Sequence, residues 1–538
     1  MKEGMFNTTL LTDEDTELIS LKQASLWASQ YLNRNVTASN ISYLLQYGRI
    51  RKYGENGTPL INMKELKCYY DALDKEKQWK NKLGQDLNWH LSFVEYKEAE
   101  RTKHVHRIHP YKGKFIPQLV EYFLDSHSDE FKKQICFQEG DIVLDPFCGS
   151  GTTLVQAYEL GIHGIGIDIS LFNSMIANVK LGRHNIPSIA EAARNLTAKL
   201  KAFQRNSSNT AFFDEELLSE LAKFNSAHFP SPEYKRKVRR GEIKEGEYAK
   251  DKEKEFLDTY YTLVKKYQIK IKQDKDDTFL SKWFLSPVRY EIDFLFEQIR
   301  SIQDKDIKKV LAIILSRTAR SCRATTHADL ATLKTPVTAA YYCKKHGKIC
   351  KPIFSIAGWW NRYSIDTLNR FQEFKKLKTE TFQICLTADS RTIDIYEEVK
   401  KKMPAFAEIL LKNKIRGIFS SPPYVGLIDY HEQHAYAYEM FGFERKDTLE
   451  IGPLSKGEGK EARASYIQGI AEVLRNCKQY LQTDYDVFLV ANDKYNLYPS
   501  IAQLAQMRIV NQFRRPVLNR VEKDRSAYEE TIFHLKES

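Results

Sequence analysis

The sequence predicts an α/β fold with a doubly wound, mostly parallel sheet that ends in an antiparallel hairpin. An apolar strand at 140–145 runs into a glycine-rich turn, a helical pattern at 152–160 follows, and a second strand at 164–168 ends in an acid. Four more apolar stretches, at 382–386, 415–419, 487–490 and 530–535, have the length and composition of strands. About 200 residues of mainly helical pattern separate the two groups, so we expect one sheet interrupted by a large helical insertion.

The composition suits a polyanionic partner without requiring one. A chain of 538 residues can form roughly two to four domains. Its 82 lysines and arginines exceed 70 acidic residues by a formal charge of +12, spread along the chain. The first residues lack an apolar signal core, and no apolar run approaches the roughly 18 residues of a membrane span. We therefore expect a soluble protein of a reducing cytoplasm that does not enter a membrane.

Residues 1–80 are expected to form a separate small unit. Polar caps at Ser20 and Thr37 precede two short helical patterns, and 48–62 has the pattern of a hairpin with a turn from Gly54 to Gly57. This order resembles the winged helix-turn-helix of excisionase and MerR-type proteins, which implies DNA binding. The alternative is a small helical cap that does not touch DNA. The candidate DNA contacts of this unit are Arg49, Arg51 and Lys52.

The glycine turn lies in the first half of the expected core, 81–180. Gly149 and Gly151 would let a ligand approach the backbone where the first strand ends, and the next helix offers free amides. Asp168, 17 residues beyond Gly151, could accept hydrogen bonds from both ribose hydroxyls of a nucleoside, although such carboxylates also occur in strand-end turns. The turn has no basic residue, which disfavours a phosphate-rich ligand and favours S-adenosylmethionine, with its positive sulfonium and amino groups.

The expected insertion, 181–380, carries dense charge of both signs at 234–255 and the apolar spacing of packed helices at 294–315. It also contains a group of cysteines with one histidine. Their spacing includes Cys-x2-His-x3-Cys, which a zinc site could use, but it is not a standard paired Cys-x2-Cys pattern. Reduced structural cysteines are the favoured interpretation, and no metal is assigned. The group consists of Cys322, Cys343, His346 and Cys350.

A Ser-Pro-Pro-Tyr segment, 421–424, follows an apolar strand in the second half of the expected core, 381–538. The exocyclic amine of a base is a poor nucleophile because its lone pair is delocalised into the ring. The Ser421 hydroxyl and the Pro422 carbonyl could accept the two amine hydrogens and localise that pair, and Pro422 and Pro423 would hold them still. Tyr424 could stack on a base rotated out of the duplex. The alternative for this segment is a stiff turn.

The glycine turn and the Ser-Pro-Pro-Tyr segment together resemble the amino-methyltransferases of DNA. The resemblance implies a Rossmann-like sheet on which both loops meet, S-adenosylmethionine as cofactor, double-stranded DNA as substrate and base flipping. His109-Pro110 resembles a further cofactor motif of that family, from which Lys112-Gly113-Lys114 departs. The cofactor contacts implied are His109, Pro110, Asp145, Pro146, Phe147, Cys148, Gly149, Ser150, Gly151, Thr152, Thr153, Asp168, Ile169, Asp389 and Ser390.

Within this family, a serine at the first position of the catalytic loop accompanies mainly N4 methylation of cytosine. Adenine N6, a guanine amine in RNA, and a catalytically inactive DNA-binding regulator are the alternatives. The motif order implies that the insertion reads sequence in the major groove, with Arg320, Arg323 and Lys334 as candidate contacts. The resemblance to this family also implies a prokaryotic restriction-modification or defence system, with a separately encoded restriction endonuclease as partner.

Overall fold

The computed structural model describes residues 18–33, 35–46, 49–53, 59–73, 87–93, 96, 98–111, 113–206, 209–327, 329, 333–517 and 528–538. These form two compact units from segments that alternate along the chain. The smaller unit comprises the described parts of Met1–Lys82, Phe212–Ile269 and Thr326–Pro352, and the larger unit comprises those of Leu83–Ala211, Lys270–Thr325 and Ile353–Ser538. The expected insertion, 181–380, is therefore not one body, because parts of it belong to each unit.

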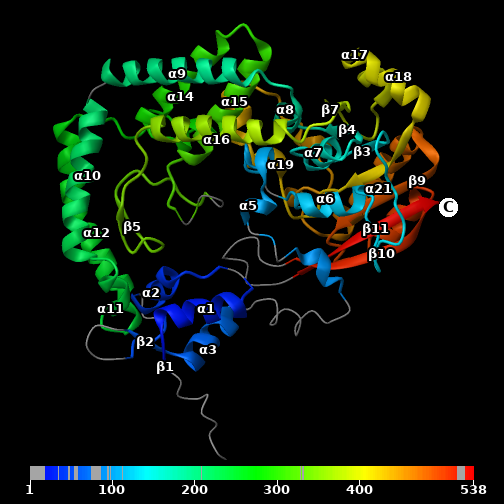
Figure 1. Cartoon of the computed structure of the whole chain (residues 1–538). Helices are drawn as coiled ribbons and strands as arrows, with labels where there is room; N and C mark the ends of the chain where they lie inside the picture. The colour runs from blue at the N-terminus through cyan, green and yellow to red at the C-terminus, as the bar shows by residue number, and fades with distance from the viewer. Residues whose placement is uncertain are drawn as a thin grey trace, which may run out of the picture. The chain divides into compact units, whose positions relative to one another are not determined.

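The larger unit is built on a sheet whose described strands have the order β10-β11-β9-β8-β3-β4-β7 (Figure 1). Strands β7, β4, β3, β8 and β9 run parallel, whereas β11 is antiparallel to both β9 and β10. The predicted α/β fold, with a mostly parallel sheet ending in an antiparallel hairpin, is confirmed. The strands are β3 (Ile142–Asp145), β4 (His163–Asp168), β7 (Gln383–Thr387), β8 (Ile415–Ser420), β9 (Leu481–Ala491), β10 (Met507–Val517) and β11 (Tyr528–Glu537).

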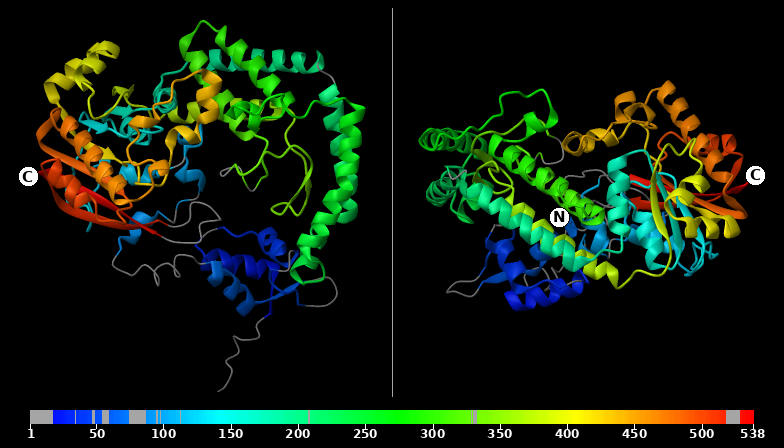
Figure 2. Two further views of the ribbon diagram at one scale, coloured as in Figure 1. Left: turned by 180° about the vertical axis from the view of Figure 1, so that it is seen from behind. Right: turned by 90° about the horizontal axis from the view of Figure 1, so that it is seen from above.

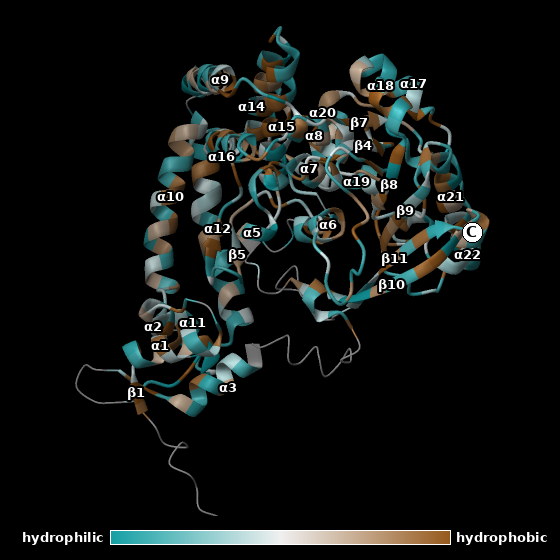
Figure 3. Ribbon diagram, turned by 45° about the vertical axis from the view of Figure 1, so that its right-hand side comes forward, coloured by the Kyte–Doolittle hydropathy of each residue, from teal (hydrophilic) through white to brown (hydrophobic). Residues whose placement is uncertain are grey.

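Strand β10 is the strand that the sequence did not reveal. Most of its first half is exposed or half-buried, and it contains Pro516, which cannot donate a ladder hydrogen bond. Both features suit an edge strand, which pairs on one side only. In Figure 3, β10 and β11 alternate between hydrophilic and hydrophobic colours along their length. Such a strand lacks the continuous apolar run by which the buried parallel strands were recognised.

Both faces of the sheet are apolar, because successive side chains of each buried strand point to opposite sides. Ile142 and Leu144 of β3 pack in one cluster with residues of α17, α18, α21 and α22. Val143, between them, packs in a second cluster with α6 and Ala157 of α7. Helices therefore cover both faces (Figure 2). They are α6 (Pro117–Leu124), α7 (Thr152–Glu159), α8 (Leu171–Leu181), α17 (Ile395–Lys402), α18 (Pro404–Asn413), α21 (Lys460–Lys478) and α22 (Tyr498–Leu504).

Further helices of the larger unit come from the expected insertion and from the loop after β8. Part-buried polar contacts join three of them: the Trp360 indole of α16 donates to Thr197 of α9 at 2.9 Å, and Arg317 of α15 pairs with Asp366 of α16 at 2.6 Å. None of the described helices is long and apolar enough to cross a membrane. These elements are α9 (Ile186–Asn206), α13 (Phe279–Trp283), α14 (Ser286–Arg300), α15 (Lys305–Ser321), α16 (Ala357–Lys375), α19 (Tyr430–Gln433) and α20 (Ala435–Phe441), with shorter turns η2 (Trp89–Ser92), α5 (Glu98–Arg101), η3 (His104–Arg107), η4 (Asp447–Leu449) and η5 (Leu454–Lys456).

The smaller unit contains α10 (Asn209–His228), α11 (Glu233–Arg239), α12 (Glu245–Lys266) and a short hairpin of β5 (Tyr341–Cys343) and β6 (Lys348–Cys350). Helices α10 and α12 lie side by side (Figure 1), joined by an ion pair between Lys266 and Glu216 at 2.6 Å. Cys343, His346 and Cys350 belong to this hairpin. Cys322, which the sequence grouped with them, belongs to the larger unit.

The first described residues form a small cluster of three helices and a two-stranded sheet, of which the strand Leu18–Ser20 was not expected. Strand β1 (Leu18–Ser20) pairs antiparallel with β2 (Leu60–Asn62), and α1 (Leu21–Tyr31), α2 (Ala38–Gln46) and α3 (Met63–Leu73) accompany them. The predicted cap at Ser20 is present, since its side chain accepts from the Gln23 amide. Tyr53 bridges to Leu60, whereas the expected turn from Gly54 to Gly57 lies outside the described residues. Arg49, Arg51 and Lys52 are exposed, and a DNA-binding winged helix remains a prediction.

Candidate active site

The two loops that the sequence singled out lie next to each other. Strands β3 and β8 are parallel neighbours in the sheet, so the loops that follow them leave at the same edge. The Ser420 hydroxyl at the end of β8 donates to Asp145 at the end of β3, with an O···O distance of 2.5 Å. The Thr153 hydroxyl donates to the Phe419 carbonyl at 3.4 Å. Segments about 270 residues apart are thus joined by direct hydrogen bonds.

A single cavity opens where four parallel strands end, and both loops line it. Residues after β3, β4, β7 and β8 all contribute, as expected for a ligand site at the carboxyl edge of a doubly wound sheet. The lining residues from these four strand ends are Asp145, Pro146, Phe147, Cys148, Gly149, Ser150, Thr152, Asp168, Ile169, Ser170, Asn173, Ala388, Asp389, Ser390, Ser421 and Pro423.

The glycine turn has a left-handed backbone at two positions, which glycine adopts without strain. Gly149 and Gly151 have φ of +51° and +79°. A Cβ atom on Gly149 would lie 3.0 Å from the Tyr111 ring, and one on Gly151 would lie 2.9 Å from the Ala177 Cβ. Gly151 is the N-cap of α7 and, like Thr153, does not line the cavity. Gly151 and Thr153, both predicted to contact the cofactor, therefore support the turn without lining the cavity.

Asp168 holds the turn as well as facing the cavity. Its carboxylate accepts from the Gly149 amide and the Ser170 amide, both at 2.8 Å, and from the Asn173 side chain at 3.1 Å. Burial raises the pKa of Asp168 to about 6, against these hydrogen bonds. Asp168 lies at the end of β4, as expected from the sequence. The sequence did not indicate that groups of the protein itself would donate hydrogen bonds to its carboxylate.

Asp145 is the second carboxyl group whose ionisation is costly. Burial raises the pKa of Asp145 to about 6, and the hydrogen bond from Ser420 opposes that shift. Among the described residues, neither Asp145 nor Asp168 forms an ion pair. The cavity therefore carries two carboxyl groups that form no ion pair among the described residues, and Lys114 and His431 line the same cavity.

The loop after β7 is tied to the glycine turn. The Ser390 hydroxyl donates to the Pro146 carbonyl at 2.7 Å. Asp389 lines the cavity and pairs with Arg391 at 2.6 Å. Burial opposes ionisation of Asp389, but hydrogen bonds from Arg391 outweigh it and hold the pKa below its usual value. Both predicted residues therefore lie at the cavity, with Asp389 already neutralised by its neighbour.

His109 and Pro110 do not line the cavity, in contrast to the expected cofactor contact. The buried His109 ring lies with Nε2 3.1 Å from the Ser316 hydroxyl and 3.2 Å from the Tyr436 hydroxyl. Burial lowers its pKa well below the usual value, so the ring is neutral. The following residues Tyr111, Gly113, Lys114 and Phe115 line the cavity instead, and Lys112 lies outside the described residues.

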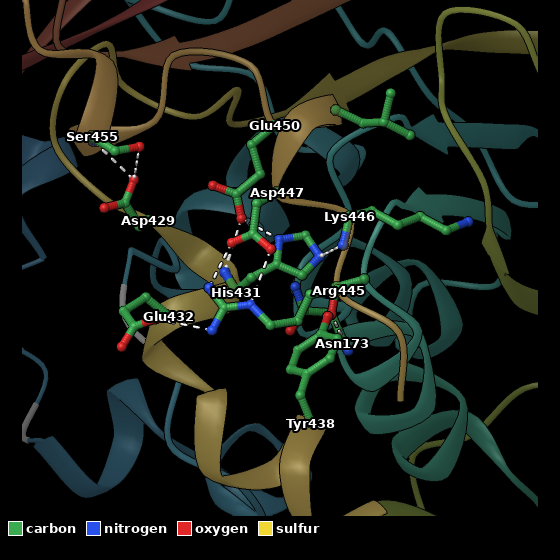
Figure 4. A network of polar contacts seen from close by, with 12 residues as sticks. Asn173, Asp429, His431, Glu432, Tyr438, Arg445, Lys446, Asp447, Glu450 and Ser455 are labelled. Carbon is green, nitrogen blue, oxygen red and sulfur yellow. Dashed lines mark hydrogen bonds and ion pairs between the residues drawn. The ribbon is translucent and has the colours of Figure 1, made fainter. Parts of the chain in front are cut away.

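A rim that sequence reasoning missed comes from α19 and the loop 449–451. Tyr430, His431 and Glu450 line the cavity, and the Tyr430 ring stacks on Tyr111 with centroids 6.1 Å apart. Figure 4 shows the polar network behind it: Glu450 accepts from the His431 amide at 2.8 Å and pairs with its ring. Arg445 bridges Asp447 and Glu432 beside this pair. No motif marks these residues, because only folding brings them to the loops.

The Ser-Pro-Pro-Tyr loop is anchored by a distant strand pair. Ser421 and Pro423 line the cavity, and Pro422 is buried. The Tyr424 hydroxyl donates to Glu530 at 2.9 Å. Glu530 pairs with Arg515 at 2.8 Å, and their side chains are only 3% and 2% exposed. Glu530 and Arg515 lie on β11 and β10, so the antiparallel hairpin positions the tyrosine.

The candidate DNA contacts of the expected insertion differ in exposure. Arg323 is only 6% exposed, and its Nε donates to the Arg320 carbonyl at 2.9 Å. Burial lowers its pKa to about 10. Arg320 is half-buried and Lys334 is exposed. In this structure Arg323 packs over the Tyr436 ring rather than facing solvent, which differs from the predicted DNA contact.

Comparison with known proteins identifies the family of the chain. The family model for N6/N4 enzymes described as "DNA methylase" matches residues 23–178. The Type II methyltransferase M.MjaII of Methanocaldococcus jannaschii is 47% identical over 529 residues, which cover 97% of each chain. Type II methyltransferase M.BsoBI of Geobacillus stearothermophilus is 31% identical over 20% of each chain, and M.MvaI of Kocuria varians is 29% identical over 20% of this chain and 22% of its own. No solved structure matches the chain. The chain therefore belongs to the amino-methyltransferases of DNA.

Proposed function

We propose that this DNA methyltransferase transfers the methyl group of S-adenosylmethionine to the N4 amine of cytosine within a specific duplex sequence. The observation that carries the proposal is the one cavity lined by both the glycine turn and the Ser-Pro-Pro-Tyr loop. A nucleoside cofactor seated on the turn would have its reactive end near the loop that receives the base.

The lining fits S-adenosylmethionine in two respects. Ser150 Oγ and Asn173 Oδ1 are buried at the cavity and have no hydrogen-bond partner among the described residues, so a polar ligand would satisfy them. Asp145 and Asp168 present carboxyl groups to a ligand that carries a positive charge. Tyr111, Phe147 and Ile169 add flat or apolar surface for an adenine and a methionine chain. When bound, the cofactor supplies a methyl group activated by its sulfonium.

The catalytic loop would bind and orient the target amine. The Ser421 hydroxyl and the Pro422 carbonyl accept its two hydrogens, which localises the nitrogen lone pair. Two locked proline φ angles and the Tyr424–Glu530 hydrogen bond keep these acceptors in place. Tyr424 stacks on the rotated base. Most of the rate enhancement then comes from positioning, and no strong base is required.

We propose cytosine N4 as the target because position 421 is a serine, and in this family a serine at that position accompanies mainly N4 methylation of cytosine. Adenine N6 is the alternative that the same loop could serve. The relative M.MjaII is named a Type II methyltransferase, which supports a role beside a separately encoded restriction endonuclease in a prokaryotic cytoplasm.

The test is incubation of the purified chain with duplex DNA and S-adenosylmethionine carrying a labelled methyl group, followed by mass spectrometry of the nucleosides. We expect N4-methylcytosine. Labelled N6-methyladenine would overturn the target base, and transfer to RNA alone would overturn the substrate.

The catalytic assignment is tested with a double variant, Ser421→Ala with Pro422→Ala. Transfer should fall by about 10³-fold or more while cofactor affinity, measured by calorimetry, stays within a few-fold. The exposed pair Pro499 and Ser500 in α22, changed to alanine in the same way, is a matched control that should keep full activity. Unchanged turnover of the first double variant would refute the assignment.

A further inference from the structure

The hairpin β5–β6 of the smaller unit gathers two thiols and two imidazoles into one group. Cys343, His346 and Cys350 come from the hairpin, and His327 joins them from the preceding segment. One ligand atom from each of the four lies within 4.8 Å of all the others. We propose that these four residues bind one Zn²⁺ ion as a structural site. This inference is independent of the proposed function.

The separations between ligand atoms suit a tetrahedral ion. With Zn–S near 2.3 Å and Zn–N near 2.0–2.1 Å, sulfur and nitrogen ligands of a tetrahedron lie about 3.6 Å apart. Cys343 Sγ lies 3.6 Å from His327 Nδ1, and Cys350 Sγ lies 3.4 Å from His346 Nδ1. Two edges of the tetrahedron are therefore present with nearly the required length.

The turn between the strands presents the ligands on one side. The amides of His346 and Gly347 both donate to the Cys343 carbonyl, at 3.0 Å and 2.7 Å. Gly347 has φ of +64°, a conformation that glycine adopts without strain. This tight turn brings His346 back over the strand that carries Cys343. The register, with Tyr341 opposite Cys350, places the second cysteine beside the first.

The hairpin has little else to stabilise it internally. Each strand has three residues, and the buried cluster of the hairpin consists of Tyr341, Cys343 and Cys350 with Val337 packed against it. Two of those three buried residues are proposed ligands. A hairpin this short is marginal in water on its own. Asn225 of α10 exchanges hydrogen bonds with the Ile349 backbone and supports it from outside, and a metal ion would add support from within.

The donor set selects the ion and its role. Two thiolates with two imidazoles in tetrahedral arrangement favour Zn²⁺ over the hard cations Mg²⁺ and Ca²⁺. Four protein ligands fill the coordination shell and leave no position for water or substrate, which makes the site structural. The Tyr341 hydroxyl lies 2.8 Å from His327 Nδ1, so metal binding would replace that hydrogen bond by a coordinate bond.

His327 is the ligand that the sequence missed, and Cys322 is the residue it included instead. Cys322 is buried in the larger unit and is not part of the group. It therefore provides a matched control: a buried cysteine, five residues from His327, that should not affect the metal.

The first measurement is the metal content of the full-length chain, purified without chelator or affinity metal. We expect elemental mass spectrometry to find one zinc ion per chain. Replacing the zinc by Co²⁺ should give the visible absorption of tetrahedral cobalt together with a thiolate charge-transfer band. Absence of stoichiometric zinc, or a disulfide between Cys343 and Cys350 in protein kept under reducing conditions, would overturn the site. Both measurements use the wild-type chain, so neither can fail because a substitution prevents folding.

The second measurement assigns the ligands. His327→Ala, Cys343→Ser and Cys350→Ser should each lose most of the zinc, and Cys322→Ser should keep it. Hydrogen exchange of 341–350 should speed up in the ligand variants and after chelation of the wild-type chain. Full zinc content in His327→Ala, or its loss in Cys322→Ser, would refute the proposed ligand set.

Discussion

The glycine turn after β3 and the Ser-Pro-Pro-Tyr loop after β8 lie at the ends of neighbouring parallel strands, yet they are held in opposite ways. The turn depends on residues without side chains: Gly149 and Gly151 have positive φ, and any Cβ there would meet Tyr111 or Ala177. The loop depends on restriction, with two prolines and a tyrosine fixed by Glu530 and Arg515.

This difference determines where each loop is vulnerable. The shape of the turn depends first on its own glycines, with hydrogen bonds to Asp168 and from Ser390 as further supports, so the most severe damage to it should come from substitutions inside it. The loop is supported from β10 and β11, about 90 to 110 residues further along the chain, so it can be damaged from a distance. The following experiments test that contrast.

The largest effect is expected from Arg515→Ala. It leaves the buried Glu530 carboxylate without its cationic partner, which should cost about 3–5 kcal/mol of stability. Transfer should fall as Tyr424 loses its support, and the measurement is denaturant unfolding together with kcat. Arg514→Ala is the matched control, because the Arg514–Glu529 pair is exposed and should contribute about 0–1 kcal/mol at most. Equal losses in the two variants would contradict a special role for the buried pair.

Gly151→Ala tests the turn from inside. The alanine must adopt a left-handed conformation and its Cβ would lie 2.9 Å from the Ala177 Cβ, so we expect a loss of about 2–4 kcal/mol and weaker cofactor binding. Gly140 also has positive φ, but a Cβ there would meet nothing within 4 Å. Gly140→Ala should therefore show the backbone strain alone, about 1–2 kcal/mol. The comparison fails if both variants lose the same stability and affinity.

The carboxyl groups beneath the turn predict opposite pH dependences for stability and binding. Burial raises the pKa of Asp145 and Asp168 to about 6, whereas carboxyls in unfolded chains titrate near about 4. Between these values the native state binds more protons than the unfolded state, so this contribution to stability is lost as pH rises through about 6.

Affinity for S-adenosylmethionine, the cofactor we propose, should instead rise as pH increases through about 6, by up to roughly tenfold per unit for each group that ionises. Calorimetric titrations from pH 5 to pH 8 measure it. S-adenosylhomocysteine, which lacks the sulfonium charge, is the control and should show a weaker dependence. If both ligands showed the same pH dependence, the ionised carboxyl groups would not act by attracting the sulfonium charge.

The smallest effect is expected from Tyr424→Phe. It removes one hydrogen bond to Glu530, which should cost about 0.5–1.5 kcal/mol, and kcat should fall several-fold because the ring is less firmly placed. Tyr485→Phe removes a similar bond, from Tyr485 to Glu537 at 2.7 Å, at residues that do not line the cavity. It should match the stability loss without changing kcat. A fall in kcat in both variants would show that Tyr424 has no particular role.

The fold was predictable to the extent that its signals are local. The strand, glycine turn, helix and acid of 140–168 are contiguous, and the buried parallel strands are apolar runs. The edge strand β10 was not recognised, because half of it faces solvent and Pro516 interrupts its pattern. Likewise the expected insertion, continuous in sequence, is divided between two units, since packing rather than sequence order decides which helices associate.

Taken alone, the sequence marked the two loops, because tolerance of positive φ by glycine and the locked φ of proline are properties of the residues themselves. It also specified which strand each loop follows, and hence that both leave the sheet at the same edge. Tertiary structure alone decided which distant side chains complete each site: Tyr111 and His431 at the cavity, Glu530 and Arg515 behind Tyr424, and His327 in place of Cys322 beside the hairpin cysteines. The physical reason is that such partners are chosen by sheet register and packing, which no local pattern records.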